Sequence, residues 1–235
     1  MPTPRRFEFK KYDASELKAA GVEFANAFKA QQDAFNAVRF GTREWTHCIL
    51  DWFCNAAPSG VRVDATGYTV GKGVRASSAK KSLLRTIAGG SRKKTKEFMV
   101  DLCHSSWPPD TEWPKEKKQE AHERWQIALK NQPVMHLALE SEMGKEASGT
   151  ANINAIMEDA TKLLHIAART KVVVVASRNE GERVQLEGLS AALSKADRTA
   201  VRWEKKDIQP SWLWIDLPWA VWDQKLGPHS WIAKS

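Results

Sequence analysis

Two glutamates separated by one residue, Glu140 and Glu142, have the types and spacing most suited to chemistry in this chain. Apolar and polar side chains alternate over residues 134–142, as on a β-strand, so both carboxylates and His136 are expected on one face. Neighbouring like charges repel, and such a pair is stable when a divalent cation or a proton lies between them. The pair therefore predicts a metal site or an acid/base site. The alternative is that both carboxylates line the solvated face of an edge strand.

The residues after these glutamates predict the elements that would hold them. Apolar side chains recur at three- and four-residue steps over residues 153–167, the pattern of an amphipathic helix. Residues 171–177 contain four consecutive valines, which suits a strand buried on both faces. Strand, helix and strand in this order predict a parallel pair with a crossover helix in an α/β sheet. Such a covered sheet leaves little room for a solvated acidic face, which favours a site.

A further acid, Asp101, precedes these elements. Residues 97–107 alternate as a strand, with Phe98, Val100 and Leu102 on one side and Asp101 on the other. A charge within such an apolar segment is costly unless something pairs with it. Residues 107–133 begin with WPPDTEWP, continue as a charged helical stretch, and are interpreted as an insertion between two strands.

The flanking regions predict helices before this core and a helix and a strand after it. Residues 13–57 are expected to form helices interrupted near Gly41, within an N-terminal helical region that spans residues 1–57 and packs on the sheet. Glu44 falls in the first turn of the second helix, where a negative charge is favourable beside the positive helix end. Residues 58–73 predict a short hairpin, residues 181–196 a helix that buries Val184, and residues 212–217 a late strand.

The charge balance favours an anionic partner. The formal net charge is +8 and the isoelectric point is about 9.4, and excess basic charge attracts polyanions. A basic loop at residues 89–96 offers the best candidates for phosphate contacts, namely Arg92, Lys93, Lys94 and Lys96. The alternative is that these residues are simply a solvated loop. The chain has 11 tryptophans, most of which are expected to be core or sheet-covering residues.

Cysteine usage and hydropathy predict a soluble cytoplasmic protein. Cys48, Cys54 and Cys103 show no paired metal spacing and are expected to be reduced, mostly buried thiols. No apolar run approaches the roughly 20 residues that a membrane span requires. We therefore expect no membrane association.

The order of these motifs resembles that of a known nuclease superfamily. The chain resembles the PD-(D/E)xK superfamily, which has the restriction-endonuclease-like fold. The resemblance lies in the order of Asp101 in FMVDL, then Glu140 and Glu142 in LALESEMG, then a helix and a valine-rich strand. The sequence is similar to uncharacterised bacterial members of that superfamily, over residues 97–177. The resemblance implies a single α/β domain over residues 1–235, with a central mixed sheet flanked by helices.

The resemblance also implies roles for individual residues. Asp101 and Glu140 match the metal-binding acids, so Mg²⁺, or Mn²⁺ as a substitute, would activate water for phosphodiester cleavage. The superfamily usually has lysine at position 142, whereas this chain has Glu142, as some restriction-type members do. Lys162 is similar to a lysine that other members carry on the following helix, although pairing with Asp159 three residues earlier is an open alternative. Glu44 resembles an extra helical acid in the metal cluster of some members.

The implied activity is Mg²⁺-dependent cleavage of DNA, with double-stranded DNA as the expected partner, in restriction, phage defence or repair. Double-strand cutters of this fold often pair two sites, so the resemblance leaves a homodimer open. One alternative is a catalytically inactive protein of the same fold that binds nucleic acid or works in a protein assembly, because lysine is missing at position 142. Another is an interaction module whose tryptophan-rich C-terminal region contacts a partner.

Overall fold

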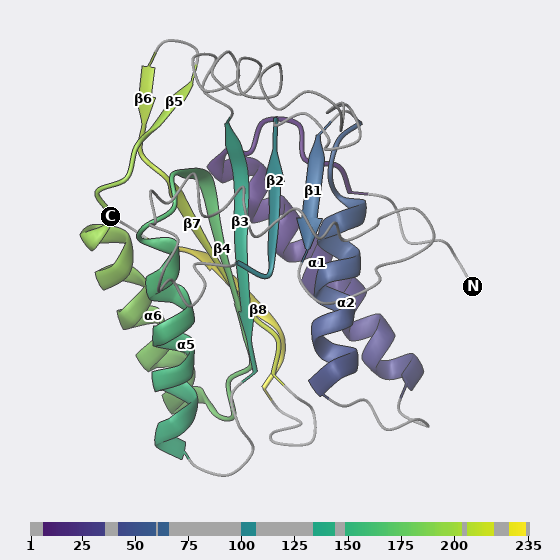
Figure 1. The fold of residues 1–235 in the computed structure, drawn as a ribbon. Coiled ribbons are helices and arrows are strands. Elements are labelled where there is room, and N and C mark those ends of the chain that lie inside the picture. The colour runs from purple at the N-terminus through teal and green to yellow at the C-terminus, as the bar shows by residue number, and fades with distance from the viewer. Residues whose placement is uncertain are drawn as a thin grey trace, which may run out of the picture.

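The protein forms a mixed β-sheet with helices on both faces (Figure 1). The computed structural model describes residues 7–35, 42–59, 61–65, 100–106, 134–143, 149–203, 206–218 and 226–233. Within these ranges six strands make one sheet and two short strands make a separate ribbon. The predicted α/β class with a central mixed sheet is confirmed.

The sheet combines parallel and antiparallel pairs. Its strands, in spatial order, are β1 (Arg62–Ala65), β2 (Leu102–Ser105), β3 (Met135–Glu142), β4 (Ala168–Val175), β7 (Ser211–Asp216) and β8 (His229–Ile232). The central strands β3, β4 and β7 are parallel to one another, while β1, β2 and β8 join by antiparallel pairing. Helix α5 (Gly149–Leu163) connects β3 to β4, so the predicted parallel pair with its crossover helix is confirmed.

Strand β3 lies inside the sheet, which corrects the edge-strand alternative for its glutamates. It pairs with β2 on one side and with β4 on the other. Residues 135–140 are all buried, and Glu140 has only 2% of its surface exposed. The four valines of β4, Val172 to Val175, are at most 1% exposed, as expected for a strand covered on both faces.

The two faces of the sheet carry separate hydrophobic cores. Leu137, Leu139 and Val172 point into the core beneath the N-terminal helices. Ala138 and Val173 point into the opposite core, which contains Ile156, Ala160 and Leu163 of α5. The alternation of β3 therefore directs Glu140 toward the α5 side, as expected.

The face of His136 was predicted wrongly. Met135 and Ala138 both pack in the α5-side core, whereas the His136 ring stacks on Tyr12 at 4.9 Å between centroids. The pairing of β2 with β3 shifts register between His104 and Ser105, opposite the start of β3. Such an irregularity redirects side chains locally, so His136 does not share the face of Glu140.

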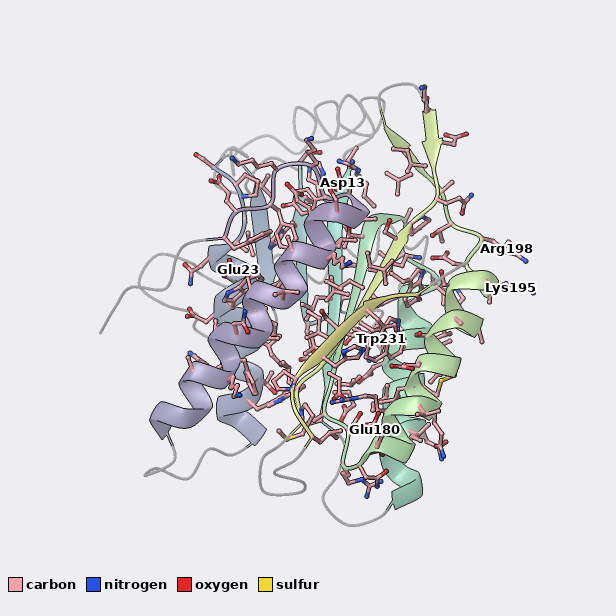
Figure 2. The ribbon with its side chains drawn as sticks, turned by 180° about the vertical axis from the view of Figure 1, so that it is seen from behind. Asp13, Glu23, Glu180, Lys195, Arg198 and Trp231 are labelled. Atoms are coloured by element: carbon pink, nitrogen blue, oxygen red, sulfur yellow. The ribbon has the colours of Figure 1, made fainter. Side chains whose placement is uncertain are left out.

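The N-terminal region forms the two predicted helices, α1 (Ala14–Phe35) and α2 (Thr42–Asn55). Asp13 starts α1, because its Oδ1 accepts the N–H groups of Ser15 and Glu16, each at 3.1 Å. The helix α1 packs against β7 and β8, as can be followed from behind in Figure 2. A Cβ atom added at Gly21 would lie 2.8 Å from Ser230 Oγ, so this close approach requires glycine.

The C-terminal half follows the prediction in part. Helix α6 (Glu180–Ala196) and β7 match the expected helix and late strand, but Val184 is 60% exposed rather than buried. The ribbon of β5 (Val201–Trp203) and β6 (Lys206–Ile208), and the edge strand β8, were not predicted. Strand β1 lies within the expected hairpin, and its described partner is β2. Residues 66–99 and the expected insertion at 107–133 lie outside the described residues.

The tryptophans and cysteines with described side chains are buried or partly buried. Trp45, Trp212 and Trp214 are fully buried, which confirms the core interpretation for these three. Among the described residues, Cys54 and Cys103 are buried and Cys48 is partly buried, and none of the three forms a disulfide. Among the helices described, none has the combination of length and apolar character that crossing a membrane demands.

Candidate functional site

Glu140 is a buried acid at the centre of the candidate site. Its Oε1 atom has no hydrogen-bond partner among the described residues. Burial, and then the neighbouring charge of Asp101, raise the pKa of Glu140 well above the usual range. A carboxylate in this setting is stabilised by gaining a cation or a proton. The sequence pattern predicted such repulsion from Glu142, whereas Asp101 has the larger effect on Glu140.

Asp101 lies beside Glu140 but just outside the strand that was predicted to contain it. Strand β2 begins at Leu102, which pairs with Leu139. Beyond this pair, Oδ2 of Asp101 accepts the backbone N–H of Ser141 at 2.9 Å and the Ser141 hydroxyl at 2.7 Å. Burial raises the pKa of Asp101, and the two bonds from Ser141 oppose that rise because they favour the ionised form.

Lys162 brings a positive charge to the two acids from the last turn of α5. Its Nζ donates to Oδ1 of Asp159 and also lies 3.9 Å from Oε1 of Glu140. Burial lowers the pKa of Lys162, but the bond to Asp159 and the charges of Glu140 and Asp101 outweigh burial and raise it. Lys162 therefore remains an ammonium group. The predicted pairing with Asp159 and the proximity to Glu140 occur together.

Glu142 ends β3, two residues beyond Glu140, and is partly exposed. Its charge adds to the rise in the pKa of Glu140, after the larger effects of burial and Asp101. The structure thus brings together four of the predicted site residues, Asp101, Glu140, Glu142 and Lys162, with Asp159 as a further acid.

Two groups of predicted site residues have side chains outside the described part of the chain. Glu44 belongs to α2, but its side chain lies outside the described part of the chain. The basic residues Arg92, Lys93, Lys94 and Lys96 also lie outside it. Their roles in metal binding and nucleic-acid binding stay predictions.

The chemistry of the site fits a Mg²⁺ ion. Among the side chains described, no group of three or more His, Cys, Asp or Glu is arranged to hold a metal. Mg²⁺, however, is commonly bound through only one or two carboxylates, with waters and substrate phosphates as its other ligands. Asp101 and Glu140 supply two such carboxylates, and the buried Oε1 of Glu140 accepts no hydrogen bond from the described residues. These two residues are therefore the candidate metal ligands.

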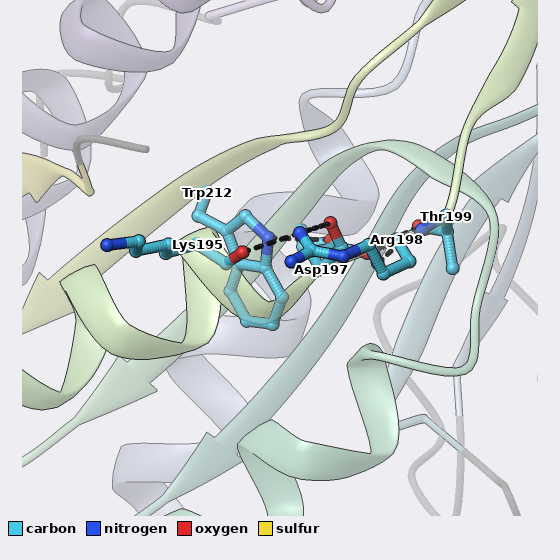
Figure 3. Close-up of polar contacts among 6 residues, drawn as sticks. Lys195, Asp197, Arg198, Thr199 and Trp212 are labelled. Atoms are coloured by element: carbon cyan, nitrogen blue, oxygen red, sulfur yellow. Dashed lines mark hydrogen bonds and ion pairs between the residues drawn. The ribbon is translucent and has the colours of Figure 1, made fainter.

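A second polar cluster, at the C-terminal end of α6, was not predicted. Lys171 Nζ donates to Asp197 Oδ2 at 2.6 Å and to Thr199 Oγ1 at 2.8 Å, and Trp212 Nε1 donates to Asp197 Oδ2 at 2.8 Å. Figure 3 shows Trp212 and Thr199 gathered around Asp197, while the Lys195 side chain extends away. In the sequence, only a lysine immediately before the valine run hinted at this buried pair.

A pocket beside this cluster is lined by Lys195, Arg198 and Gln209 among others, and by none of the acids around Glu140. The carboxylate among its lining residues, Asp197, is engaged by Lys171, Thr199 and Trp212. A satisfied ion pair of this kind has a structural role. The chemistry thus favours the carboxylates of β3 and Asp101 over this pocket as the functional site.

Ser141 is the site residue that the sequence pattern did not single out. Its only signal was a hydroxyl between two glutamates on a strand.

Comparison of the chain with protein-family models, with curated proteins and with solved structures gave no match. The site itself is therefore the main guide to function.

Proposed function

We propose that this protein is a divalent-metal-dependent nuclease that cleaves DNA, with Asp101 and Glu140 as the metal ligands. The observation that carries the proposal is the buried Glu140 carboxylate, whose Oε1 has no hydrogen-bond donor among the described residues. The nearby Asp101 charge makes the ionised pair unfavourable. A divalent cation between the two carboxylates would offset this repulsion.

The order of the elements supports a restriction-endonuclease-like core. The chain has the same order of elements as the PD-(D/E)xK superfamily. An acid lies immediately before β2, and the acidic strand β3, the helix α5 and the valine-rich strand β4 follow it. The parallel pairing of β3 with β4 and the position of Lys162 on α5 agree with this proposal.

The side chains around the two candidate metal ligands suggest separate catalytic roles for Lys162 and Glu142. When bound, Mg²⁺ supplies a water of lowered pKa and neutralises charge on the phosphate. Lys162, which stays protonated, would orient the attacking water and substrate phosphate rather than remove a proton. Glu142 is partly exposed at the end of β3 and would accept the proton of that water. Lys162 would thereby replace the lysine that the superfamily usually carries at position 142.

The net charge of +8 supports a nucleic-acid substrate, since basic proteins attract the phosphate backbone. We propose double-stranded DNA as the substrate, held by phosphate contacts from Arg92, Lys93, Lys94 and Lys96. The proposal also includes a homodimer in which two sites are paired. A role in restriction or phage defence follows from the family resemblance.

A catalytically inactive nucleic-acid-binding protein is the second candidate. The observation in its favour is that Lys162 is already bonded to Asp159, while position 142 holds glutamate. If the ammonium cannot leave Asp159, Lys162 would not assist the attacking water, and position 142 offers no lysine in its place. The two candidates share the fold and differ in whether phosphodiester bonds are cut.

A cleavage assay separates these candidates. Supercoiled and linear DNA would be incubated with the wild-type protein in Mg²⁺, Mn²⁺ or EDTA, beside Glu140→Gln and the control Glu23→Gln on the exposed face of α1. Cleavage that requires metal, persists in Glu23→Gln and disappears in Glu140→Gln supports the nuclease. Salt-sensitive DNA binding without cleavage in either metal supports the inactive protein instead.

A further inference from the structure

Ser141 makes two hydrogen bonds to one oxygen of Asp101. Its backbone N–H and its hydroxyl both donate to Oδ2, at 2.9 Å and 2.7 Å. Hydrogen bonds to an ionised carboxylate are stronger than those between neutral groups. Two such bonds from one residue restrict both the position and the rotation of the Asp101 carboxylate.

The sheet explains why Asp101 needs this support. Pairing between β2 and β3 ends with Leu102 opposite Leu139, so Asp101 lies one residue beyond the ladder. Its side chain, rather than a backbone carbonyl, accepts the next N–H, that of Ser141. Ser141 directly follows Glu140 on β3, so the same strand that carries one candidate ligand also holds the other.

We infer that Ser141 is a positioning residue, which fixes the Asp101 carboxylate beside Glu140 so that the two can share one divalent cation. The inference rests on the proposed metal-dependent function and deepens it. Removing the hydroxyl would leave the backbone N–H as the donor from Ser141 and hold the carboxylate less firmly. Metal affinity would then fall because the ligand must be ordered at the moment of binding.

The chain offers a closely matched set of variants. Ser141→Ala removes the hydroxyl that donates to Asp101, and Ser141→Thr retains a hydroxyl on a residue that suits strands. Ser105→Ala is the control, because Ser105 is 2% exposed on the neighbouring strand β2. Its Oγ makes no hydrogen bond within the described part of the chain. The control therefore removes a buried strand hydroxyl without touching Asp101.

Mn²⁺ binding, measured by calorimetry on the full chain, is the direct test. We expect Ser141→Ala to weaken Mn²⁺ binding about tenfold, the loss of roughly one charge-assisted hydrogen bond. Ser141→Thr should recover most of the affinity, and Ser105→Ala should match the wild type. In cleavage assays the Mg²⁺ concentration for half-maximal rate should rise in parallel, with a smaller change in the rate at saturating Mg²⁺.

The opposing results are distinct. If the wild type binds Mn²⁺ and Ser141→Ala binds it as tightly as Ser105→Ala does, Ser141 is not a positioning residue and the metal site stands. A lower melting temperature of Ser141→Ala with unchanged Mn²⁺ affinity also excludes a positioning role, since the bonds are then only structural. If the wild type itself binds no Mn²⁺, the proposed metal-dependent function fails, and the role of Ser141 fails with it.

Discussion

Lys162 Nζ lies 3.9 Å from Oε1 of Glu140 while it donates a hydrogen bond to Asp159. One ammonium group is thus shared between an acid on its own helix and an acid on β3. Its charge lowers the pKa of Glu140, but burial and the Asp101 charge have the larger effects and raise it overall. Lys162 therefore compensates the acidic site only in part, and the remaining cost falls on the stability of the metal-free protein.

Replacing Lys162 should separate metal binding from catalysis. In Lys162→Met an unbranched side chain of similar length remains and the charge is lost, so a cation meets less repulsion and Mn²⁺ should bind more tightly. Cleavage at saturating Mg²⁺ should nevertheless fall by about 10²-fold, because the group that orients the attacking water is gone. Calorimetry and single-turnover cleavage measure the two effects.

The matched control for this experiment is Lys195→Met, which removes an exposed lysine of α6 from the pocket near Asp197. It should leave both measurements close to those of the wild type. Unchanged cleavage in Lys162→Met would mean that the lysine serves only to pair with Asp159.

Neutralising Glu140 should stabilise the protein while it abolishes activity. Glu140→Gln keeps the shape of the side chain and removes a buried charge that lies beside Asp101. We expect the free energy of unfolding in EDTA to increase by about 0.5–2 kcal/mol, the usual gain from a single stabilising substitution. For a chain of this size, each kcal/mol corresponds to roughly 2–4 °C in melting temperature. A variant that melts below both the wild type and Glu23→Gln would contradict this account of the site.

The stabilisation by Glu140→Gln should depend on pH in a defined direction. The folded pKa of Glu140 lies above its unfolded value of about 4.5, so the folded state binds the proton more tightly. The cost of the charge is therefore fully present above the raised pKa and fades as the pH falls through it. Urea unfolding of both proteins between pH 8 and about pH 4.5 should show their difference shrinking on acidification. A difference that grows on acidification would mean that the pKa of Glu140 is lowered instead.

The sequence was sufficient for the elements whose patterns are local. The valine run of β4 and the alternation of β3 predicted a buried parallel pair, and the pair was found. The contacts that make the site depend on tertiary packing instead. Asp101 lies outside β2 and accepts hydrogen bonds from Ser141 because the β2–β3 ladder ends at Leu102. No local sequence pattern predicts where that ladder ends.

Other differences have similar causes. The edge strand β8 has only four residues, and it forms by pairing with β7. Val184 occupies an apolar position of α6 yet is exposed, and single apolar residues are common on protein surfaces. The register shift opposite Ser105 moved His136 away from the face of Glu140, although the alternation of β3 taken alone placed them together.

Breaking the buried pair of Lys171 and Asp197 should strongly destabilise the fold. Lys171 is fully buried, and burial lowers its pKa, although the bond to Asp197 opposes this effect. Lys171→Ala would leave the Asp197 carboxylate, 6% exposed, without its counter-charge. Breaking such a pair costs about 3–5 kcal/mol, whereas removing both charges costs less because none is left unpaired. In urea unfolding, Lys171→Met combined with Asp197→Asn should therefore lose less stability than the sum of the two single variants. Additive losses would show that the two charges stabilise the fold independently, against the 2.6 Å contact between them.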